Sequence, residues 1–425
     1  MTTTALTPAN RADAATSRAD ATADVLISGG GLVGHTLAIA LAAHGVRSIV
    51  VDPADPAVTL AQQFDGRASA IASGAWKMME AIGLAPHLDG HGCPIERIWV
   101  SDGLKPGELD FAPADDEGFL GIMFENRRMR IALNDAVNAH ALIDNRAPVE
   151  TTSIDRDEHR ATITLADGSV LTAPLLCVCE GRRSSTRDGE RMPMAKWSYH
   201  HIAMVGAIAH EAPHENVAYE IFYSEGPFAL LPLNDLPDGR HRSAFVWSVN
   251  EKDVAGYMKL GPRGFVAEMT RRMGGILGAI EEIAPRSTFP LTFQHSAELT
   301  GQRMALVGDT AHGIHPIAGQ GFNLGLRDVA TLVEVIVDGM RTGMDPGDAQ
   351  LLARYQRWRG LDNLSVAAST DGLTRLFGVP GRAASAVRRL GLGGVQKSGI
   401  LKKFFMAEAR GELGDLPKLL AGNLV

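Results

Sequence analysis

Three glycines near the N-terminus have the spacing of a turn that binds phosphate. Gly29, Gly31 and Gly34 form a G-x-G-x-x-G pattern after a short apolar run, and Asp52 ends the next apolar run. Such glycines allow a tight turn and let backbone N–H groups approach a pyrophosphate, while the acid accepts hydrogen bonds from ribose hydroxyls. The pattern predicts a dinucleotide site rather than a purely structural turn. The residues expected to hold the cofactor here are Gly29, Gly31, Leu32, Val33, Gly34 and Asp52.

A second glycine-rich segment covers residues 308–323, after another short apolar run and before a helical pattern. The carboxylate of Asp309 could bind a polyol hydroxyl. The turn at residues 319–321 would place backbone N–H groups at a helix start, where a developing anion is stabilised. Two such segments favour one cofactor that is held from both ends. His312 and His315 could instead be metal ligands, but a tight loop against a ligand fits this setting better, and we expect no metal.

From about residue 23 onward, the chain resembles the flavoprotein monooxygenases of the para-hydroxybenzoate hydroxylase class, and within it the ubiquinone-biosynthesis hydroxylases of the UbiH/UbiF type. Besides the two glycine-rich segments, residues 65–70 (DGRASA) are similar to the D-x-R-x-x-A segment of that class. Residues 125–127 (ENR) and 226–233 (GPFALLPL) resemble the ubiquinone subgroup. The family motif A-D-G-x-x-S-x-x-R corresponds to residues 179–187, with Glu180 in place of the usual Asp. Asp52 likewise stands where the family usually has Glu.

The resemblance implies FAD as the cofactor and a role for each matching residue. Asp309 would bind the ribityl chain, and Arg67 and Arg127 would lie along the FAD. The segment 308–323 would supply further FAD contacts from Gly308, Asp309, Gly319, Gly321, Phe322 and Asn323. The residues expected to line the isoalloxazine, and so to be catalytic, are Pro316, Gly319, Gln320 and Gly321. Those expected near the substrate are Phe228, Leu230, Pro232 and His315.

The reaction implied by this resemblance is hydroxylation of a phenolic ring through a flavin C4a-hydroperoxide. O2 would be the oxidant, NAD(P)H the expected reductant, and a polyprenylated ubiquinone precursor the substrate. His315 could accept the phenolic proton, although a structural role is the favoured interpretation. The alternatives are an FAD-dependent oxidase or reductase of a lipid, and a non-catalytic protein of the same fold that binds a lipid or prenyl group.

The motifs require particular elements to position them. The apolar run at residues 25–27, the helical stretch after it and the run at 46–51 predict a β-α-β unit with a right-handed crossover. Alternation around Asp167-Gly168 predicts a hairpin. Four further strand-like segments predict an antiparallel sheet, and a long helix is expected at 321–339. Those four segments are residues 202–208, 217–223, 228–231 and 243–249.

We therefore expect a mixed α/β (α+β) chain. It would consist of a Rossmann-like FAD-binding domain, an inserted substrate domain with an antiparallel sheet, and a helical C-terminal region. The expected boundaries are 1–22 for a disordered tail, 23–75, 121–190 and 286–345 for the discontinuous FAD-binding domain, 76–120 and 191–285 for the substrate domain, and 346–425 for the helical region.

The composition is that of a globular protein, with 45% hydrophobic and 21% charged residues. A net charge of -8 argues against general nucleic-acid binding. The cysteines are Cys93, Cys177 and Cys179, a sparse and odd set that indicates a reducing compartment. Redox or metal chemistry at Cys177 and Cys179 is the alternative to a buried strand, which fits better. No apolar run suits a membrane span or a secretory signal, so we expect a cytoplasmic protein.

The C-terminal region has an unusual charge. Residues 382–410 carry seven basic side chains and one acid, Glu408, in a chain of negative net charge. Leu401, Phe404 and Phe405 fall on one face of a helix, with two lysines beside it. Such a helix could contact the anionic inner membrane or a multi-enzyme complex. The alternative, which the sequence favours, is a terminal helix that packs these three side chains into the core.

Overall fold

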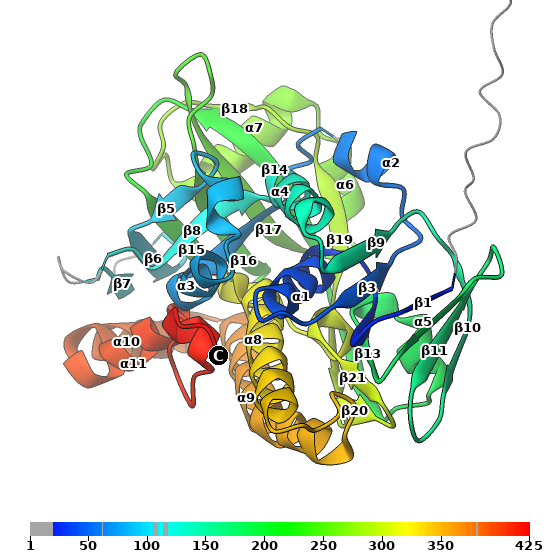
Figure 1. Cartoon of the computed structure of the whole chain (residues 1–425). Coiled ribbons are helices and arrows are strands. Elements are labelled where there is room, and N and C mark those ends of the chain that lie inside the picture. Colours follow the sequence, from blue (N-terminus) through cyan, green and yellow to red (C-terminus); the bar gives the residue numbers. More distant parts are fainter. Residues whose placement is uncertain (1–19, 62, 105–108, 114–117, 380) are drawn as a thin grey trace, which may run out of the picture.

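The computed structural model describes residues 20–425, except residues 62, 105–108, 114–117 and 380. Two large sheets dominate this part of the chain (Figure 1). One is mostly parallel and carries helices, and the other is mostly antiparallel and lies beside it. This is the mixed α/β architecture that the sequence predicts.

The parallel sheet is built around β2, the strand before the first glycine motif. Its order is β20-β21-β13-β2-β3-β9, and only β20 is antiparallel to its neighbour. The chain runs from β2 outward to β3 and β9, then returns to β13 and β21 on the other side. The loops after β2 and β13 therefore meet at a topological switch point, where open α/β sheets bind ligands. The strands are β2 (Val25–Ser28), β3 (Ser48–Val51), β9 (Ile143–Arg146), β13 (Leu175–Val178), β20 (Thr300–Gly301) and β21 (Met304–Leu306).

Apolar packing holds this sheet and its helices together. Val25, Leu26 and Ile27 are fully buried, as expected for a parallel strand that is covered on both faces. Cys177 is buried inside β13, as expected, whereas Cys179 is buried just after the strand ends. Helix α1 packs against α4 and α8, and α9 packs against α8. These helices are α1 (Leu32–Ala42), α4 (Asn126–Ala139), α8 (Gln320–Arg341) and α9 (Ala349–Gly378).

The second large sheet has the order β22-β19-β14-β17-β16-β15-β6-β7, with β18 beside β14. All four strand-like segments of the sequence lie in it. Its neighbours are antiparallel except β15 and β6, which run parallel. The strands are β6 (Arg97–Asp102), β7 (Leu109–Phe111), β14 (Met194–His210), β15 (Val217–Tyr223), β16 (Gly226–Leu233), β17 (His241–Asn250), β18 (Ile280–Glu282), β19 (Ser287–Ser296) and β22 (His312–Gly313).

The two faces of this sheet have different neighbours. Helix α7 (Pro262–Met273) covers one face, where Phe265 packs with Phe245 and Trp247 in a dry cluster. The opposite face meets the DGRASA segment. A Cβ placed on Gly66 would lie 2.4 Å from the Cα of Gly206 in β14, so the two backbones touch there. A glycine pair at this contact is what lets the two parts of the chain approach so closely.

The predicted hairpin is present as β11 (Ala161–Leu165) and β12 (Val170–Ala173) in a small sheet with β10 (Thr151–Arg156). One expectation is wrong here. Ala21 and Thr22, assigned to a disordered tail, form β1, which pairs with β12 in parallel. Two residues carry little strand signal of their own, so only the neighbouring strand makes them a strand. Residues 1–19 of the expected tail lie outside the described residues.

Two expected domain boundaries also differ from the structure. β19 and β22 were placed in the FAD-binding domain, but both belong to the antiparallel sheet. Met78 and Met79 of α3 (Ser73–Ala81), placed in the substrate domain, pack into the core of the parallel sheet. Long-range packing decides both cases. The small sheet of β4 (Ala68–Ala72), β5 (Cys93–Ile95) and β8 (Gly121–Glu125) draws strands from both expected domains.

The C-terminal region is helical, as expected, with α9 followed by α10 (Arg382–Lys397) and α11 (Gly399–Ala409). A buried ion pair between Arg388 and Asp102, with 3.0 Å between Nε and Oδ1, fixes α10 to β6. The favoured prediction for α11 is wrong. Leu401, Phe404 and Phe405 are 46%, 53% and 38% exposed instead of buried in the core. Among the described residues, no helix has the length and apolar character to cross a bilayer.

The remaining short helices are α2 (Pro56–Ala61), α5 (Ser185–Gly189) and α6 (Val254–Lys259). Of these, α5 follows the loop after β13 and so lies close to the switch point.

Candidate functional site

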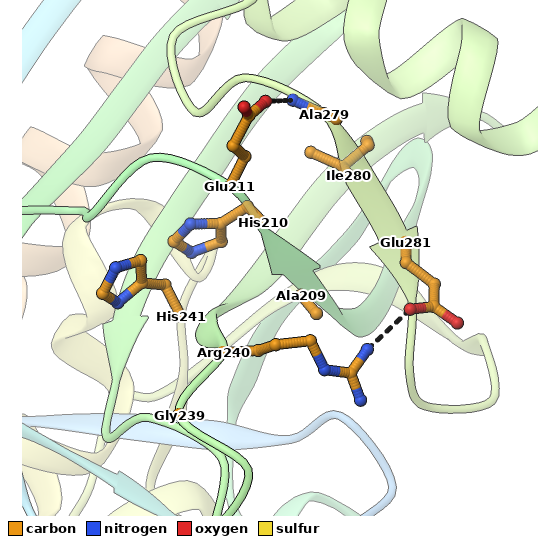
Figure 2. Close-up of a pocket in the computed structure, with 9 residues that line it drawn as sticks. All are labelled: Ala209, His210, Glu211, Gly239, Arg240, His241, Ala279, Ile280 and Glu281. Carbon is orange, nitrogen blue, oxygen red and sulfur yellow. Dashed lines mark hydrogen bonds and ion pairs between the residues drawn. The ribbon is translucent and has the colours of Figure 1, made fainter.

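A cavity of about 420 Å³ opens at the rim of the antiparallel sheet, but it contains none of the predicted site residues. Figure 2 shows two polar contacts among the residues that line it. Arg240 reaches Glu281 at 2.6 Å, and Glu211 accepts a hydrogen bond from the backbone N–H of Ala279. His210 is held by the carbonyl of Ala212. This cavity is therefore a hollow at the edge of the sheet, remote from the switch point.

The glycine turn after β2 has two kinds of glycine. Gly29 has φ +104°, and a Cβ there would lie 2.5 Å from the carbonyl oxygen of Cys179. A Cβ on Gly34 would lie 1.9 Å from the carbonyl oxygen of Gly29. Both glycines are thus required by the fold itself. Gly31 differs, because its Cβ would meet no protein atom within 4 Å. The space beside Gly31 is open for a ligand.

A cavity of about 140 Å³ adjoins Gly31. Asp52 stands at its edge, where its Oδ2 accepts the N–H of Gly30 at 2.6 Å and its Oδ1 accepts that of Ala54 at 2.7 Å. The N-terminus of α1 also faces this space and has no side-chain cap, so its N–H groups are free for an anion. The cavity is lined by Gly30, Gly31, Leu32, His35, Asp52, Ala54, Pro56, Thr59, Leu60, Arg130, Leu133, Asn134, Asn145 and Ala147.

Arg130 supplies a positive charge that the sequence analysis missed. Its Nε and Nη2 atoms are buried and have no hydrogen-bond partner among the described residues. Burial lowers the pKa of Arg130, and the charges of Arg67 and Arg127 lower it further. A buried, unpaired guanidinium is costly unless an anion joins it. The signal in the sequence was the position of Arg130 three residues after Arg127, on the same helix face.

The loop, the uncapped helix, Asp52 and Arg130 together fit the ADP half of FAD. The amides of Gly31 and Leu32 and the guanidinium of Arg130 would hold the pyrophosphate, and Asp52 would hold the ribose. Arg67 lies nearby, pairs with Asp65 through its Nε at 2.6 Å and stacks over the ring of Phe289.

The two glycine-rich segments meet in space. Gly308 has φ +64°, and a Cβ there would press against both methyl groups of Val33 at 3.1 Å. Val33 belongs to the first motif and Gly308 to the second. The next residue, Asp309, lies at the carboxyl end of β21, and its side chain is 40% exposed. Its Oδ2 accepts a hydrogen bond from Arg182 at 3.0 Å. This placement leaves the carboxylate accessible to a polyol chain.

Glu180, the unusual member of the third motif, has a local structural task. Its carboxylate accepts hydrogen bonds from the hydroxyls of Ser28, Ser184 and Thr186, at 2.7, 2.7 and 2.5 Å, and from the N–H of Thr186. It therefore ties the end of β2 to the start of α5. Arg187 completes the anchor, because its Nη1 donates to the carbonyl of Thr310 in the second segment.

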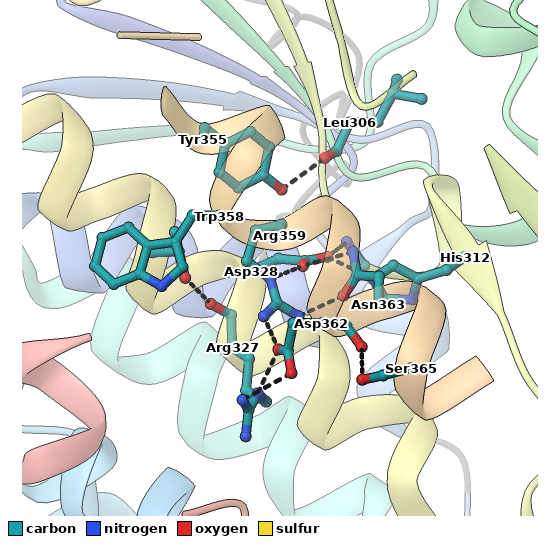
Figure 3. A network of polar contacts seen from close by, with 12 residues as sticks. Leu306, His312, Arg327, Asp328, Tyr355, Trp358, Arg359, Asp362, Asn363 and Ser365 are labelled. Carbon is teal, nitrogen blue, oxygen red and sulfur yellow. Dashed lines mark hydrogen bonds and ion pairs between the residues drawn. The ribbon is translucent and has the colours of Figure 1, made fainter. Parts of the chain in front are cut away.

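A buried polar network holds the second glycine-rich segment against α8 and α9 (Figure 3). Asp328 of α8 accepts hydrogen bonds from the N–H of Gly308 at 2.9 Å, from His312 Nε2 at 2.6 Å and from Arg359 Nε of α9 at 2.7 Å. Although burial opposes ionisation, His312 and Arg359 hold the pKa of Asp328 well below its usual range. Arg359 is further paired with Asp362 and Asn363. The network positions the loop and leaves His312 with a carboxylate partner.

The expected isoalloxazine residues lie at the N-terminus of α8. Pro316 is exposed, and Gly319, at φ +64°, begins the helix without a side-chain cap. A Cβ on Gly319 would approach Ala70 of β4 at 3.3 Å. The side-chain amide of Asn323 accepts the N–H of Ala72 and donates to the carbonyl of Ala70, and so joins α8 to β4. Two further expected contacts, Gln320 and Phe322, follow Gly319, and Phe322 packs against the main core.

His315 lies on the far side of this loop. Its ring makes an edge contact with Tyr199, with 5.1 Å between the centroids, and it is almost fully buried. Burial lowers the pKa of His315 to about 3, with further lowering by His201 and Arg182. A neutral, weakly basic imidazole in this position agrees with the structural interpretation of this residue.

Phe228 and Leu230 do not face the flavin loops. Both are fully buried in the cluster under α7, and Pro232 shares their face by the alternation of β16. We therefore correct their expected role from substrate contacts to core residues. The opposite face of β16 carries Leu231 and Leu233, which pack near Ala68 and Ala70 of the DGRASA segment, together with Ala229.

Fold and site together define an FAD-dependent hydroxylase, and comparison with known proteins agrees. Residues 22–361 match the model of the FAD binding domain family, so the chain belongs to that family. The chain is 42% identical over 410 residues to the ubiquinone hydroxylase UbiL of Rhodospirillum rubrum, covering 96% of this chain and 94% of the relative. It is 30% identical over 391 residues to 3-demethoxyubiquinol 3-hydroxylase of Escherichia coli, covering 91% and 98%.

Solved structures show the same fold. PqsL of Pseudomonas aeruginosa, in complex with 2-aminobenzoylacetate, matches with a TM-score of 0.74 at 22% identity, covering 89% of this chain and all of that chain. The p-nitrophenol 4-monooxygenase PnpA of Pseudomonas putida matches with a TM-score of 0.75 at 16% identity, covering 93% and 100%. The predictions of an FAD-dependent monooxygenase, of its fold class and of its resemblance to the ubiquinone hydroxylases are confirmed.

Proposed function

We propose that this hydroxylase acts on the phenolic ring of a polyprenylated ubiquinone precursor, with O2 as oxidant and NAD(P)H as reductant. The observation that carries the proposal is the 42% identity, over nearly the whole length, with a protein named as a ubiquinone hydroxylase. The E. coli relative is named for hydroxylation of a demethoxyubiquinol, a related ring.

Each part of the site has a task in this function. The turn at Gly31, with Arg130, would hold the pyrophosphate, Asp52 the ribose and Asp309 the ribityl chain. FAD, when bound, supplies the redox chemistry that activates O2. The N-terminus of α8 would face the isoalloxazine, and its helix dipole would favour negative charge there. The apolar side chains of β16 would exclude water from the ring.

The surface of α10 and α11 suits a substrate with a long apolar chain. Leu401, Phe404 and Phe405 are exposed beside Lys402 and Lys403, and further exposed apolar side chains continue the surface. Exposed apolar side chains with basic residues beside them are typical of a surface that contacts an anionic membrane. We propose that the protein works in the cytoplasm at the inner face of the membrane. The further exposed side chains are Val387, Leu390 and Ile400.

Product analysis tests the main proposal. The purified protein with FAD, NADH or NADPH and a short-chain prenylated phenol should consume O2 and release a product with one additional oxygen atom. Oxidation of the substrate without oxygen insertion would favour the lipid oxidase or reductase. Binding of the phenol without turnover, in protein that holds FAD reducible by dithionite, would favour the non-catalytic alternative.

Co-sedimentation with vesicles tests the membrane proposal. The double variant Lys402→Glu and Lys403→Glu should lose most of its binding to vesicles with anionic lipid, because each basic residue near the surface contributes about 1 kcal/mol. The double variant Lys252→Glu and Lys259→Glu, on exposed positions of the other domain, makes the same charge change and should bind normally. Equal binding of both variants would contradict the proposal.

A further inference from the structure

Glu220 is an acidic residue on the face of the antiparallel sheet that looks toward the flavin loops. It lies in β15, paired with Val100 of β6 and Ala229 of β16. Paired residues of neighbouring strands point to the same side, so Glu220 points away from α7 and from the Phe228 cluster. The sequence analysis did not single out this residue, because its strand neighbours are mostly apolar or aromatic.

The next residue on the same face locates this side chain relative to the site. Phe222, two positions along β15, packs against Ile317 of the loop before α8 and against Phe377 of α9. Ala218, two positions back, packs with Ala70 of the DGRASA segment. Glu220 therefore lies between two residues whose clusters include Ile317 of the loop before α8 and Ala70 of the DGRASA segment.

The carboxylate of Glu220 is deep in the molecule and still accessible. Desolvation by burial raises the pKa of the Glu220 carboxyl group to about 8. The residue as a whole is half-buried rather than fully enclosed. Within the described part of the chain, Glu220 has no hydrogen-bond or ion-pair partner, which is expensive for a carboxyl group unless a ligand supplies one.

The charged groups of the neighbouring elements do not account for the raised pKa of Glu220. Arg388 of α10 is paired with Asp102, and Arg375 of α9 is paired with Asp371 at 2.7 Å. Burial alone raises the pKa of Glu220. Among the described residues, the groups just named do not shift it, and neither do Arg389 of α10 and His315 of the loop.

We propose that Glu220 is the general base that takes the hydroxyl proton from the phenolic ring of the substrate. The proposal rests on the function proposed above. In this step the phenolic O–H bond breaks and an O–H bond to a carboxylate oxygen of Glu220 forms. The electron pair stays on the phenolic oxygen, which enriches the ring in electrons for attack on oxygen. No oxidation or reduction occurs in the step, and the proton passes to solvent when the product leaves.

Basicity favours Glu220 over His315 for this task. A phenol has a pKa near 10, and a base with a pKa of about 8 accepts its proton at much lower cost than an ordinary carboxylate near 4.3. His315, with its pKa lowered to about 3, is a far weaker base and lies against Tyr199. The base form of Glu220 accumulates as the pH rises, so hydroxylation should accelerate up to about pH 8.

The test compares Glu220→Gln with Glu225→Gln, an exposed control on the turn after β15. With a short-chain prenylated phenol, Glu220→Gln should keep FAD and bind the phenol, but lose about 10²-fold in the rate of hydroxylation under single turnover. The rise of the wild-type rate toward pH 8 should disappear in Glu220→Gln and persist in the control. A fluorinated phenol of lower pKa should recover part of the lost rate.

A second measurement does not depend on turnover. In oxidised wild-type protein, the negative charge of the Glu220 carboxylate should shift the phenolate absorbance of the bound phenol to a higher pH, and this shift should be absent in Glu220→Gln. An unchanged pH profile and an unchanged phenolate shift in Glu220→Gln would overturn the proposal. If the variant fails to fold, the wild-type profile decides, because a rate independent of pH between 6 and 9 would also overturn it. Absence of hydroxylation in the wild type would instead count against the proposed function.

Discussion

Replacement of Gly31 by alanine separates cofactor binding from folding. The residue has φ -77° and ψ -169°, a conformation that alanine adopts without strain. The new methyl group would meet no protein atom within 4 Å and would project beside the cavity near Asp52. Apoprotein stability should therefore stay the same or rise by about 0.4–1 kcal/mol, because the unfolded chain loses freedom.

FAD affinity should fall in the same variant. The methyl group would hold the pyrophosphate away from the N–H groups at the start of α1. Losing one hydrogen bond to a charged group costs about 1.5–3 kcal/mol, which corresponds to roughly a 10- to 150-fold rise in Kd. The contrasting variant is Gly34→Ala, whose methyl group would lie 1.9 Å from the carbonyl oxygen of Gly29 and should destabilise the fold itself.

Two assays check this reasoning. Quenching of FAD fluorescence on titration with apoprotein gives Kd, and urea unfolding of the apoprotein gives the free energy of unfolding. Gly31→Ala should raise the Kd for FAD, and Gly34→Ala should lower the free energy of unfolding. A Gly31→Ala protein that binds FAD within twofold of the wild-type Kd would refute the assignment of this turn to the pyrophosphate.

The remaining predictions concern buried charges. Asp328→Asn should lower the free energy of unfolding by about 3–5 kcal/mol in urea, because Arg359 loses its buried carboxylate. The pKa of Asp328 is depressed in the folded state, so its contribution is complete above about pH 4 and is lost as the pH falls further; the variant should lack this part of the acid dependence. Arg130→Met should raise the Kd for FAD at least tenfold without destabilising the apoprotein, whereas Arg128→Met, at an exposed position of the same helix, should bind FAD normally. A loss of apoprotein stability in Arg130→Met would contradict an unpaired role for this guanidinium.

Local sequence patterns were sufficient to predict many of the secondary-structure elements of this protein. The glycine turn, its strands and its helix follow from residues that are close in sequence, because a tight turn and an apolar run need no distant partner. The hairpin at Asp167-Gly168 and the long helix α8 were predictable for the same reason. The meeting of the first motif with Asp309 could be anticipated only because both motifs follow strands that end at one edge of a parallel sheet.

The sequence left other features undecided, because they depend on which surfaces meet. A strand pattern shows that alternate residues of β16 share a face, but packing against α7 decides that Phe228 belongs to the core. An amphipathic helix shows an apolar face, but only the tertiary structure shows that Phe404 lies on the surface. Arg130 and Glu220 have no distinctive neighbours in sequence. Only the fold leaves two guanidinium nitrogens of Arg130 buried without a partner and desolvates Glu220, and on this basis we propose ligand-binding roles for both. Burial is set by contacts between residues far apart in the chain, and for that reason the tertiary structure alone decided these roles.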